Sequence, residues 1–253
     1  MARAIAETKL MFNRNLTKTL RSPESVFMAL VVPIVMMILF GFVFGGVADI
    51  EGFSYINFIV PGIILQCMTN ASGATALSIH NDMSKGIFDR FRSMRISSSA
   101  FLSGHVWMSV MRSVIITIVI IGAAFVVGFR PSAGFTDWLI IAALLTLFII
   151  AMTWVVAIIG LIADDSESIS GFNFLLVILT FVSSGFAPTE TLPTAMRIFA
   201  ENQPMTPVID ALRALMLGLP MNNELWVAIA WCVGIAVVAF VIALRIYKGK
   251  LTR

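Results

Sequence analysis

The sequence predicts an all-α polytopic membrane protein with six transmembrane helices. Hydrophobic residues make up 59% of its 253 residues, charged residues make up only 12%, and the mean hydropathy is +0.96. A water-soluble domain normally carries about 25% charged residues, so the surroundings of this chain must be largely lipid. Its apolar runs are far longer than the roughly 10-residue alternating segments of a membrane β-barrel. We therefore treat residues 1–253 as a single transmembrane domain.

Six apolar stretches are long enough to cross the hydrocarbon core of a bilayer, which takes about 20 helical residues. They are 26–46, 56–79, 105–129, 138–163, 170–186 and 225–247. Helices are expected throughout, because backbone groups in lipid must be hydrogen-bonded within their own segment. A charged segment precedes the first stretch, whose apolar run exceeds that of a signal peptide, so cleavage is not expected.

Basic residues gather in the N-terminal segment, in the connection between the second and third stretches, and in the C-terminal tail. They are Arg3, Lys9, Arg14, Lys18, Arg21, Lys85, Arg90, Arg92, Arg95, Arg245, Lys248, Lys250 and Arg253. Cytoplasmic loops of membrane proteins are enriched in Lys and Arg. The distribution thus predicts an inner-membrane protein with both termini in the cytoplasm, in keeping with an even number of spans.

The first 22 residues mix apolar and basic side chains without an apolar run long enough to cross a bilayer. Leu10, Phe12 and Leu16 alternate with Arg14 and other basic residues. This composition favours an interfacial helix over 1–22, held by its apolar side and by anionic lipid. A frayed basic tail is the alternative.

The cytoplasmic connection 80–104 contains an amphipathic pattern. Its apolar positions are Met83, Ile87, Phe91 and Met94, and its charged positions are Lys85, Asp89 and Arg92. Spacings of three and four residues place each set on one face of a short helix. Such a helix could dock a cytoplasmic partner or rest on the membrane surface.

Residues 187–224 follow the fifth stretch on the outer side and predict two short helices. One is expected from near Pro193 to near Asn202. The other begins with Thr206 as N-cap and Pro207 as first helical residue, and it ends at Gly218. Neither is long enough to cross the bilayer, so we expect a re-entrant or interfacial pair that closes the outer end of the fifth helix.

Gln66 and Asn70 lie four residues apart on the second stretch, so they share one face of the predicted helix. Polar side chains in hydrocarbon are costly, and this face should therefore contact protein or a watery cavity rather than lipid. Hydrogen bonding between helices is one explanation, and a possible substrate path is the other.

Several kinds of chemistry are absent from the sequence. There is no G-x-x-x-x-G-K-[ST] loop, so the chain has no P-loop of its own and any ATP must be hydrolysed by another protein. His80 and His105 lie in no spacing typical of a metal site, and no catalytic residues are assigned. The basic residues form no single face, so no nucleic-acid partner is expected despite a net charge of +3.

Seven short motifs, in order along the chain, resemble those of ABC-2-type exporter permeases, and most closely the daunorubicin-resistance type. They are 40–46 FGFVFGG, 55–63 YINFIVPGI, 81–93 NDMSKGIFDRFRS, 128–131 GFRP, 181–188 FVSSGFAP, 202–207 NQPMTP and 211–215 ALRAL. Each motif is weak by itself, but together they cover about residues 20–220. The sequence departs from the family at 94–96, where it has MRI and relatives usually have LPI.

The resemblance implies a six-helix half-transporter with an N-terminal elbow helix, a cytoplasmic coupling helix at about 82–94, and outer re-entrant helices after helix five. Two permease copies, expected as a homodimer, would pair with two separate ABC ATPase subunits that bind the ATP and Mg²⁺; this chain itself would bind no cofactor. The positions assigned to ATPase coupling are Asp82, Met83, Lys85, Gly86, Ile87, Asp89, Arg90, Phe91 and Arg92. Gly41 and Gly45 have the spacing that permits close helix packing.

The expected function is therefore export of hydrophobic or amphipathic compounds, such as drugs, antibiotics or lipid-like molecules, from the cytoplasm or inner leaflet. Export of polysaccharide or lipid-linked glycan is the nearest alternative. A secondary transporter should show paired charges within the membrane or inverted repeats, and neither is evident. A membrane scaffold without transport activity is the remaining possibility.

Overall fold

The structure is a computed structural model of residues 1–253, and it describes residues 8, 10–17, 23–44, 49–50, 53–85 and 98–251. The predicted all-α class is confirmed in this part of the chain. The β-structure described there is a pair of two-residue strands, β1 (Asp49–Ile50) and β2 (Phe53–Ser54), in an antiparallel hairpin.

Each of the six predicted apolar stretches corresponds to one helix, although the predicted 170–186 continues five residues past the end of its helix. The helices are α2 (Pro23–Phe44), α3 (Tyr55–Ser84), α5 (Ser98–Val127), α6 (Phe135–Ile162), α7 (Ser166–Phe181) and α10 (Glu224–Leu251). Among the described residues, three stretches are long and apolar enough to cross a membrane: Phe101–Val127, Phe135–Ile162 and Glu224–Lys250. The described part of the chain is thus that of a membrane protein.

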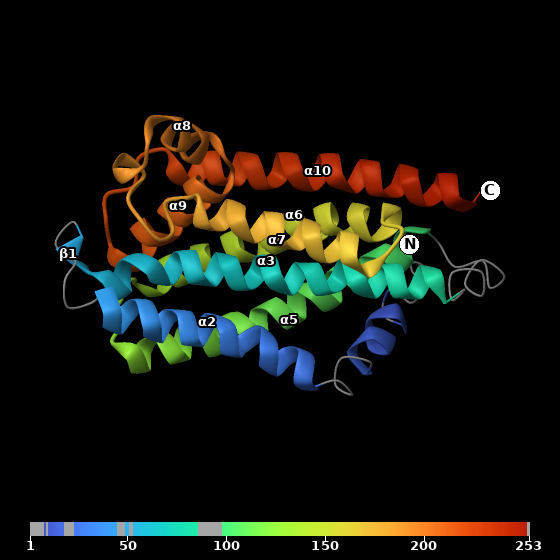
Figure 1. Ribbon diagram of the computed structural model, residues 1–253, viewed down its shortest axis with the longest axis horizontal. Coiled ribbons are helices and arrows are strands. Elements are labelled where there is room, and N and C mark those ends of the chain that lie inside the picture. The colour runs from blue at the N-terminus through green and yellow to red at the C-terminus, as the bar shows by residue number, and fades with distance from the viewer. Residues whose placement is uncertain are drawn as a thin grey trace.

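The six long helices lie roughly along the longest axis of the molecule (Figure 1). The C-terminal end of α10, the end of α3 that carries Asp82 and the helical segment 10–17 lie at one end, which we call the Asp82 end. The hairpin and the short helices α8 (Thr194–Asn202) and α9 (Met205–Leu217) lie at the opposite end, the α9 end.

Helix α3 is the centre of the bundle, and α2, α5, α6, α7 and α9 all pack against it. The sequence explains this position, because α3 carries a row of polar side chains that includes Gln66, Thr69 and Ser72, all buried. Placing them against protein avoids the cost of exposing polar groups to lipid. Helix α10, in contrast, presents Trp226, Val237 and other large apolar side chains on its outer surface.

Two glycines allow neighbouring backbones to approach α3 closely. A Cβ atom at Gly62 would lie 2.6 Å from the carbonyl oxygen of Gly185, and one at Gly160 would lie 2.5 Å from that of Ala76. No larger residue fits these places unless the backbone moves. Gly41 of α2 lies against Ile56 of α3 and Val127 of α5, whereas Gly45 is outside the described residues.

The segment after α7 contains the 3₁₀ turn η1 (Thr189–Thr191), α8 and α9. The bounds of α8 agree with the predicted helix. Helix α9 ends at Leu217, and Gly218, whose φ is 66°, forms its left-handed C-cap as predicted. The predicted start of α9 is wrong by two residues, because the helix begins at Met205 after Pro204. Thr206 is not the cap; its hydroxyl instead donates to the carbonyl of Ala200 at 2.6 Å and joins α9 to α8.

Helix α9 is buried on nearly all sides, and Arg213 anchors it to the bundle. The Arg213 Nε donates to the carbonyl of Phe58 at 3.3 Å, and the Nη2 donates to the carbonyl of Ser184. Its Nη1 pairs with Asp210 at 2.7 Å, while the guanidinium carbon lies 3.9 Å from the ring centre of Phe58. One side chain therefore ties α9 both to the start of α3 and to the segment after α7.

Candidate functional site

The connection between α3 and α5 is the site that the sequence assigns to partner coupling. Asp82 and Met83 lie in the last turn of α3, which ends at Ser84, and Lys85 follows it. The other assigned residues, Gly86, Ile87, Asp89, Arg90, Phe91 and Arg92, lie outside the described residues. The structure thus defines how the two flanks of the connection are held.

The carboxylate of Asp82 is buried where three segments meet. Arg14 of the segment 10–17 donates to both its oxygens, with Nη1 to Oδ2 at 2.8 Å and Nη2 to Oδ1 at 3.0 Å. The Nε2 of His105, in α5, lies 3.3 Å from Oδ2. Asp82 is 1% exposed and His105 is 3% exposed, so these contacts are shielded from solvent. We call the three residues the Asp82 cluster.

The electrostatics of the Asp82 cluster favour the ionised carboxylate. Burial works to raise the pKa of Asp82, but the hydrogen bonds from His105 and Arg14, with their positive charges, outweigh it and hold that pKa well below its ordinary value. Two-point binding of a carboxylate by a guanidinium also fixes its orientation. The cluster consequently joins residues that lie on either side of the connection.

Apolar packing surrounds the cluster. Met11 is 1% exposed and packs against Gly104, while the ring of Phe101 lies 5.0 Å from that of His105 and 5.6 Å from that of Tyr247 in α10. Four segments, 10–17, α3, α5 and α10, therefore converge at the Asp82 end. In the segment 10–17 the buried side chains are Met11 and Asn15, whereas Leu10 is 60% exposed.

Sequence reasoning missed the Asp82 cluster. Asp82 was assigned to partner contact, but the structure places its side chain inside the protein. His105 was considered only as a metal ligand. The three residues are far apart in sequence, and no spacing rule brings Arg14 to Asp82. One signal was available: Asp82 follows one apolar stretch and His105 begins the next. Polar side chains at such places need hydrogen-bond partners when they are buried.

The polar face of α3 is partly explained by contacts to α7. The Nδ2 of Asn173, in α7, donates to the Oδ1 of Asn70 at 3.4 Å, which is a bond between helices as one of the two sequence interpretations expects. Gln66 is 5% exposed, and its Oε1 has no hydrogen-bond partner among the residues that the structure describes. Nearer the Asp82 end, Arg112 of α5 donates to the Thr75 hydroxyl at 3.2 Å.

Within the described residues, no three His, Cys, Asp or Glu side chains gather as metal ligands would. The polar contacts found are instead structural connections between long apolar helices. A helical bundle with an apolar outer surface and a polar central helix defines a polytopic integral membrane protein.

Comparison with known proteins gives the family. The profile of the ABC-2 type transporter family matches residues 6–217, so this chain belongs to that family of ABC transporter permeases. The resemblance drawn from the sequence motifs is therefore confirmed.

Three curated relatives cover most of the chain. The daunorubicin resistance ABC transporter permease protein DrrB1 of Streptomyces coeruleorubidus is 27% identical over 90% of this chain and 81% of its own length. The probable doxorubicin resistance ABC transporter permease protein DrrC of Mycobacterium tuberculosis is 28% identical over 94% of this chain and 86% of its own length. The inner membrane transport permease YadH of Escherichia coli is 26% identical over 75% of this chain and 76% of its own length.

Asp82→Asn should lower the melting temperature of the purified protein at pH 7 by roughly 4–8 °C. It removes charge-assisted hydrogen bonds, which together contribute about 2 kcal/mol. The pKa of Asp82 is lower in the folded state than the ordinary value of about 3.9, so its stabilisation is complete above about pH 5 and is lost as the pH falls. The difference between the melting temperatures of the two proteins should accordingly become smaller from pH 5 to pH 3.

The matched control is Glu167→Gln, at an exposed position in the first turn of α7, which should melt like the parent protein at each pH. Equal melting of Asp82→Asn and parent at pH 7, or a difference in melting temperature that does not shrink between pH 5 and pH 3, would contradict the role given to the cluster.

Proposed function

We propose that this chain is the membrane-spanning permease of an ATP-driven exporter, energised by a separate ABC ATPase. The observation that carries the proposal is the family match over residues 6–217 in a sequence that has no P-loop. Membership of the family implies an ABC ATPase partner. The ATP and Mg²⁺ belong to that partner, and we expect two ATPase subunits to act on two copies of this permease.

The proposed topology has six membrane spans, formed by α2, α3, α5, α6, α7 and α10. Both termini and the Asp82 end face the cytoplasm, because the basic residues of the sequence gather there. The proposed elbow helix at the cytoplasmic interface covers residues 1–22, of which the structure describes residue 8 and the helical segment 10–17. Helices α8 and α9 are the outer re-entrant pair, and the burial of α9 among the long helices supports this placement.

The connection after Asp82 is the proposed contact with the ATPase. Met83, Ile87 and Phe91 supply its apolar face, and the charged residues fix the orientation of the partner more than they add to affinity. Asp82 itself acts as a positioning residue, because its carboxylate is buried with Arg14 and His105. Movement of the ATPase would thus be transmitted to the membrane helices by the connection between α3 and α5, whose flanks are held in the bundle.

Phe91→Ala should reduce capture of the ATPase by about thirtyfold, since truncating an aromatic anchor at an interface commonly costs about 2 kcal/mol. The measurement is co-purification of the ATPase with the tagged permease, together with hydrolysis stimulated by daunorubicin. Phe199→Ala is the matched control, because Phe199 is a half-exposed aromatic on α8 at the α9 end. Normal ATPase capture and normal export by Phe91→Ala would exclude this helix as the coupling element.

The proposed substrates are hydrophobic or amphipathic compounds, and two relatives named for daunorubicin or doxorubicin resistance make daunorubicin the first compound to test. We place their path along the polar face of α3. Asn70 is half-buried beside Asn173 of α7, and the oxygen of Gln66 has no partner among the described residues. A passing ligand could supply the missing donor.

Replacing Gln66 and Asn70 together with Leu should change the relative export rates of different compounds, measured in proteoliposomes with the ATPase present. The reason is that polar groups in an apolar path select ligands by their hydrogen-bonding groups. Thr69→Val is the control, because the Thr69 hydroxyl bonds to the Leu65 carbonyl of its own helix. If the double variant melts earlier but transports the same compounds at the same ratios, the two residues only connect helices.

A further inference from the structure

A second binding site lies between α3, α5 and α6, away from the proposed path. It is a cavity of about 270 Å³ lined by Met68 of α3, by Ser113 and Thr117 of α5, and by Trp138, Ala142 and Thr146 of α6, with further apolar side chains between them. Met68 is two residues from both Gln66 and Asn70. Two residues turn a helix by about 200°, so the cavity lies on the opposite face of α3.

Ser113 and Thr117 set this cavity apart from ordinary packing. Both residues are buried, at 0% and 6% exposure, and neither hydroxyl has a hydrogen-bond partner in the part of the chain that the structure describes. Hydroxyls within apolar helices usually bond to the carbonyl four residues earlier. Six others here do so: Thr69, Ser72, Thr146, Thr153, Ser170 and Thr180.

The spacing of the two hydroxyls fits a shared role. They lie four residues apart on α5, one turn above the other on the same face. Ser109, one turn earlier in the same row, is hydrogen-bonded to the hydroxyl of Thr153 of α6 at 3.0 Å. Where the row continues beside the cavity, no such partner from α6 is present among the described residues. Buried hydroxyls without a partner are costly, and a ligand with one polar group would satisfy them.

The walls of the cavity define the chemistry of its ligand. None of the residues that line it is charged, so the ligand must be neutral. Val114, Ile118 and Ala142 line the cavity and are also exposed on the apolar outer surface, which places its mouth towards lipid. Along α6 the lining runs from Trp138 to Ile149, and twelve residues of helix span about 18 Å, so the cavity is elongated.

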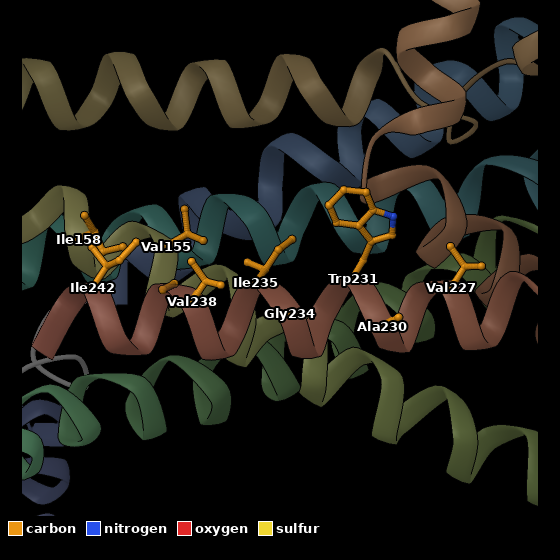
Figure 2. Close-up of a pocket in the computed structure, with 10 residues that line it drawn as sticks. Val155, Ile158, Val227, Ala230, Trp231, Gly234, Ile235, Val238 and Ile242 are labelled. Atoms are coloured by element: carbon orange, nitrogen blue, oxygen red, sulfur yellow. The ribbon is translucent and has the colours of Figure 1, made fainter.

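The larger groove between α6 and α10 differs from this cavity in the chemistry of its walls (Figure 2). Its volume is about 710 Å³, and side chains such as Val155, Ile158, Trp231 and Val238 make its walls almost wholly apolar. Nothing on those walls selects one occupant over another. The smaller cavity, in contrast, combines an apolar body with two hydrogen-bonding groups at one place, as a ligand site does.

We propose that this cavity binds a small, uncharged, elongated amphipath that enters from the bilayer, with its hydroxyl or carbonyl group paired to Ser113 and Thr117. The site is separate from the substrate path proposed along Gln66 and Asn70, and it requires neither the ATPase nor transport. A bound amphipath would fill the space between α5 and α6 and connect both helices to α3.

The test uses the full chain in lipid nanodiscs and two photoreactive probes, octanol and octane that each carry a diazirine. After irradiation, mass spectrometry locates the labelled residues. Octanol should label the cavity, at Met68 or on the facing turns of α5 and α6. The double variant Ser113→Ala/Thr117→Val should reduce this labelling about tenfold, because it removes two hydrogen bonds without filling the cavity. Labelling by octane should not change.

Two further variants keep the test decisive. Ala142→Phe, which fills the mouth of the cavity, should prevent labelling there by both probes. Thr180→Val removes a buried hydroxyl that already has a partner in α7, and it should leave labelling unchanged. Melting temperatures identify any variant that is not folded, and labelling is compared only between folded proteins.

Three results would overturn the proposal. Equal octanol labelling of the parent and the Ser113→Ala/Thr117→Val variant would show that the hydroxyls do not recognise the ligand. Labelling confined to other places, such as the groove between α6 and α10, would show that the cavity is not a site. Loss of cavity labelling in the presence of excess daunorubicin would assign the cavity to the transported compound instead of a bilayer amphipath.

Discussion

A carboxylate buried at the end of a membrane helix must be paired, because an isolated charge away from water is among the costliest groups to bury. Asp82 meets this constraint with Arg14 and His105, and the pairing determines much of the Asp82 end. It holds the N-terminal segment 10–17 on the bundle and brings the start of α5 back to the end of α3. The connection between those two helices is assigned to partner coupling. Both of its flanking helices are therefore held in place by the Asp82 cluster.

The same need to satisfy polar groups orders the rest of the bundle. Helix α3 has the polar side chains and lies at the centre, while α10, which is almost entirely apolar over its length, lies at the surface with its side chains exposed. At the α9 end, the buried Arg213 reaches two backbone carbonyls and Asp210, and so fixes α9 among the long helices. Polar contacts thus hold both ends of the bundle, and the polar side chains between the two ends face its interior. The hydroxyls of Ser113 and Thr117 are among the buried groups without a partner in the described residues.

Much of this architecture could be predicted from the sequence, because apolar runs of about 20 residues and end signals such as Gly218 are local features. The six helices, the two short helices before α10 and the polar face of α3 were expected on that basis. The start of α9 was misplaced, since Pro204 tolerates a helix start as well as Thr206 does. The partners of Asp82, Arg213 and Asn70 depend on which helices become neighbours, and no local pattern in one sequence specifies that.

In the proposed function, the Asp82 cluster couples movement of the ATPase to movement of the membrane helices. The most direct test reconstitutes the permease with its ATPase in proteoliposomes and measures the daunorubicin transported per ATP hydrolysed. Arg14→Gln should lower this ratio severalfold while hydrolysis continues, because the connection would no longer be held to the segment 10–17. Arg197→Gln, which breaks an exposed ion pair with Glu201 at the α9 end, should leave the ratio unchanged. An unchanged ratio in Arg14→Gln would contradict the claim.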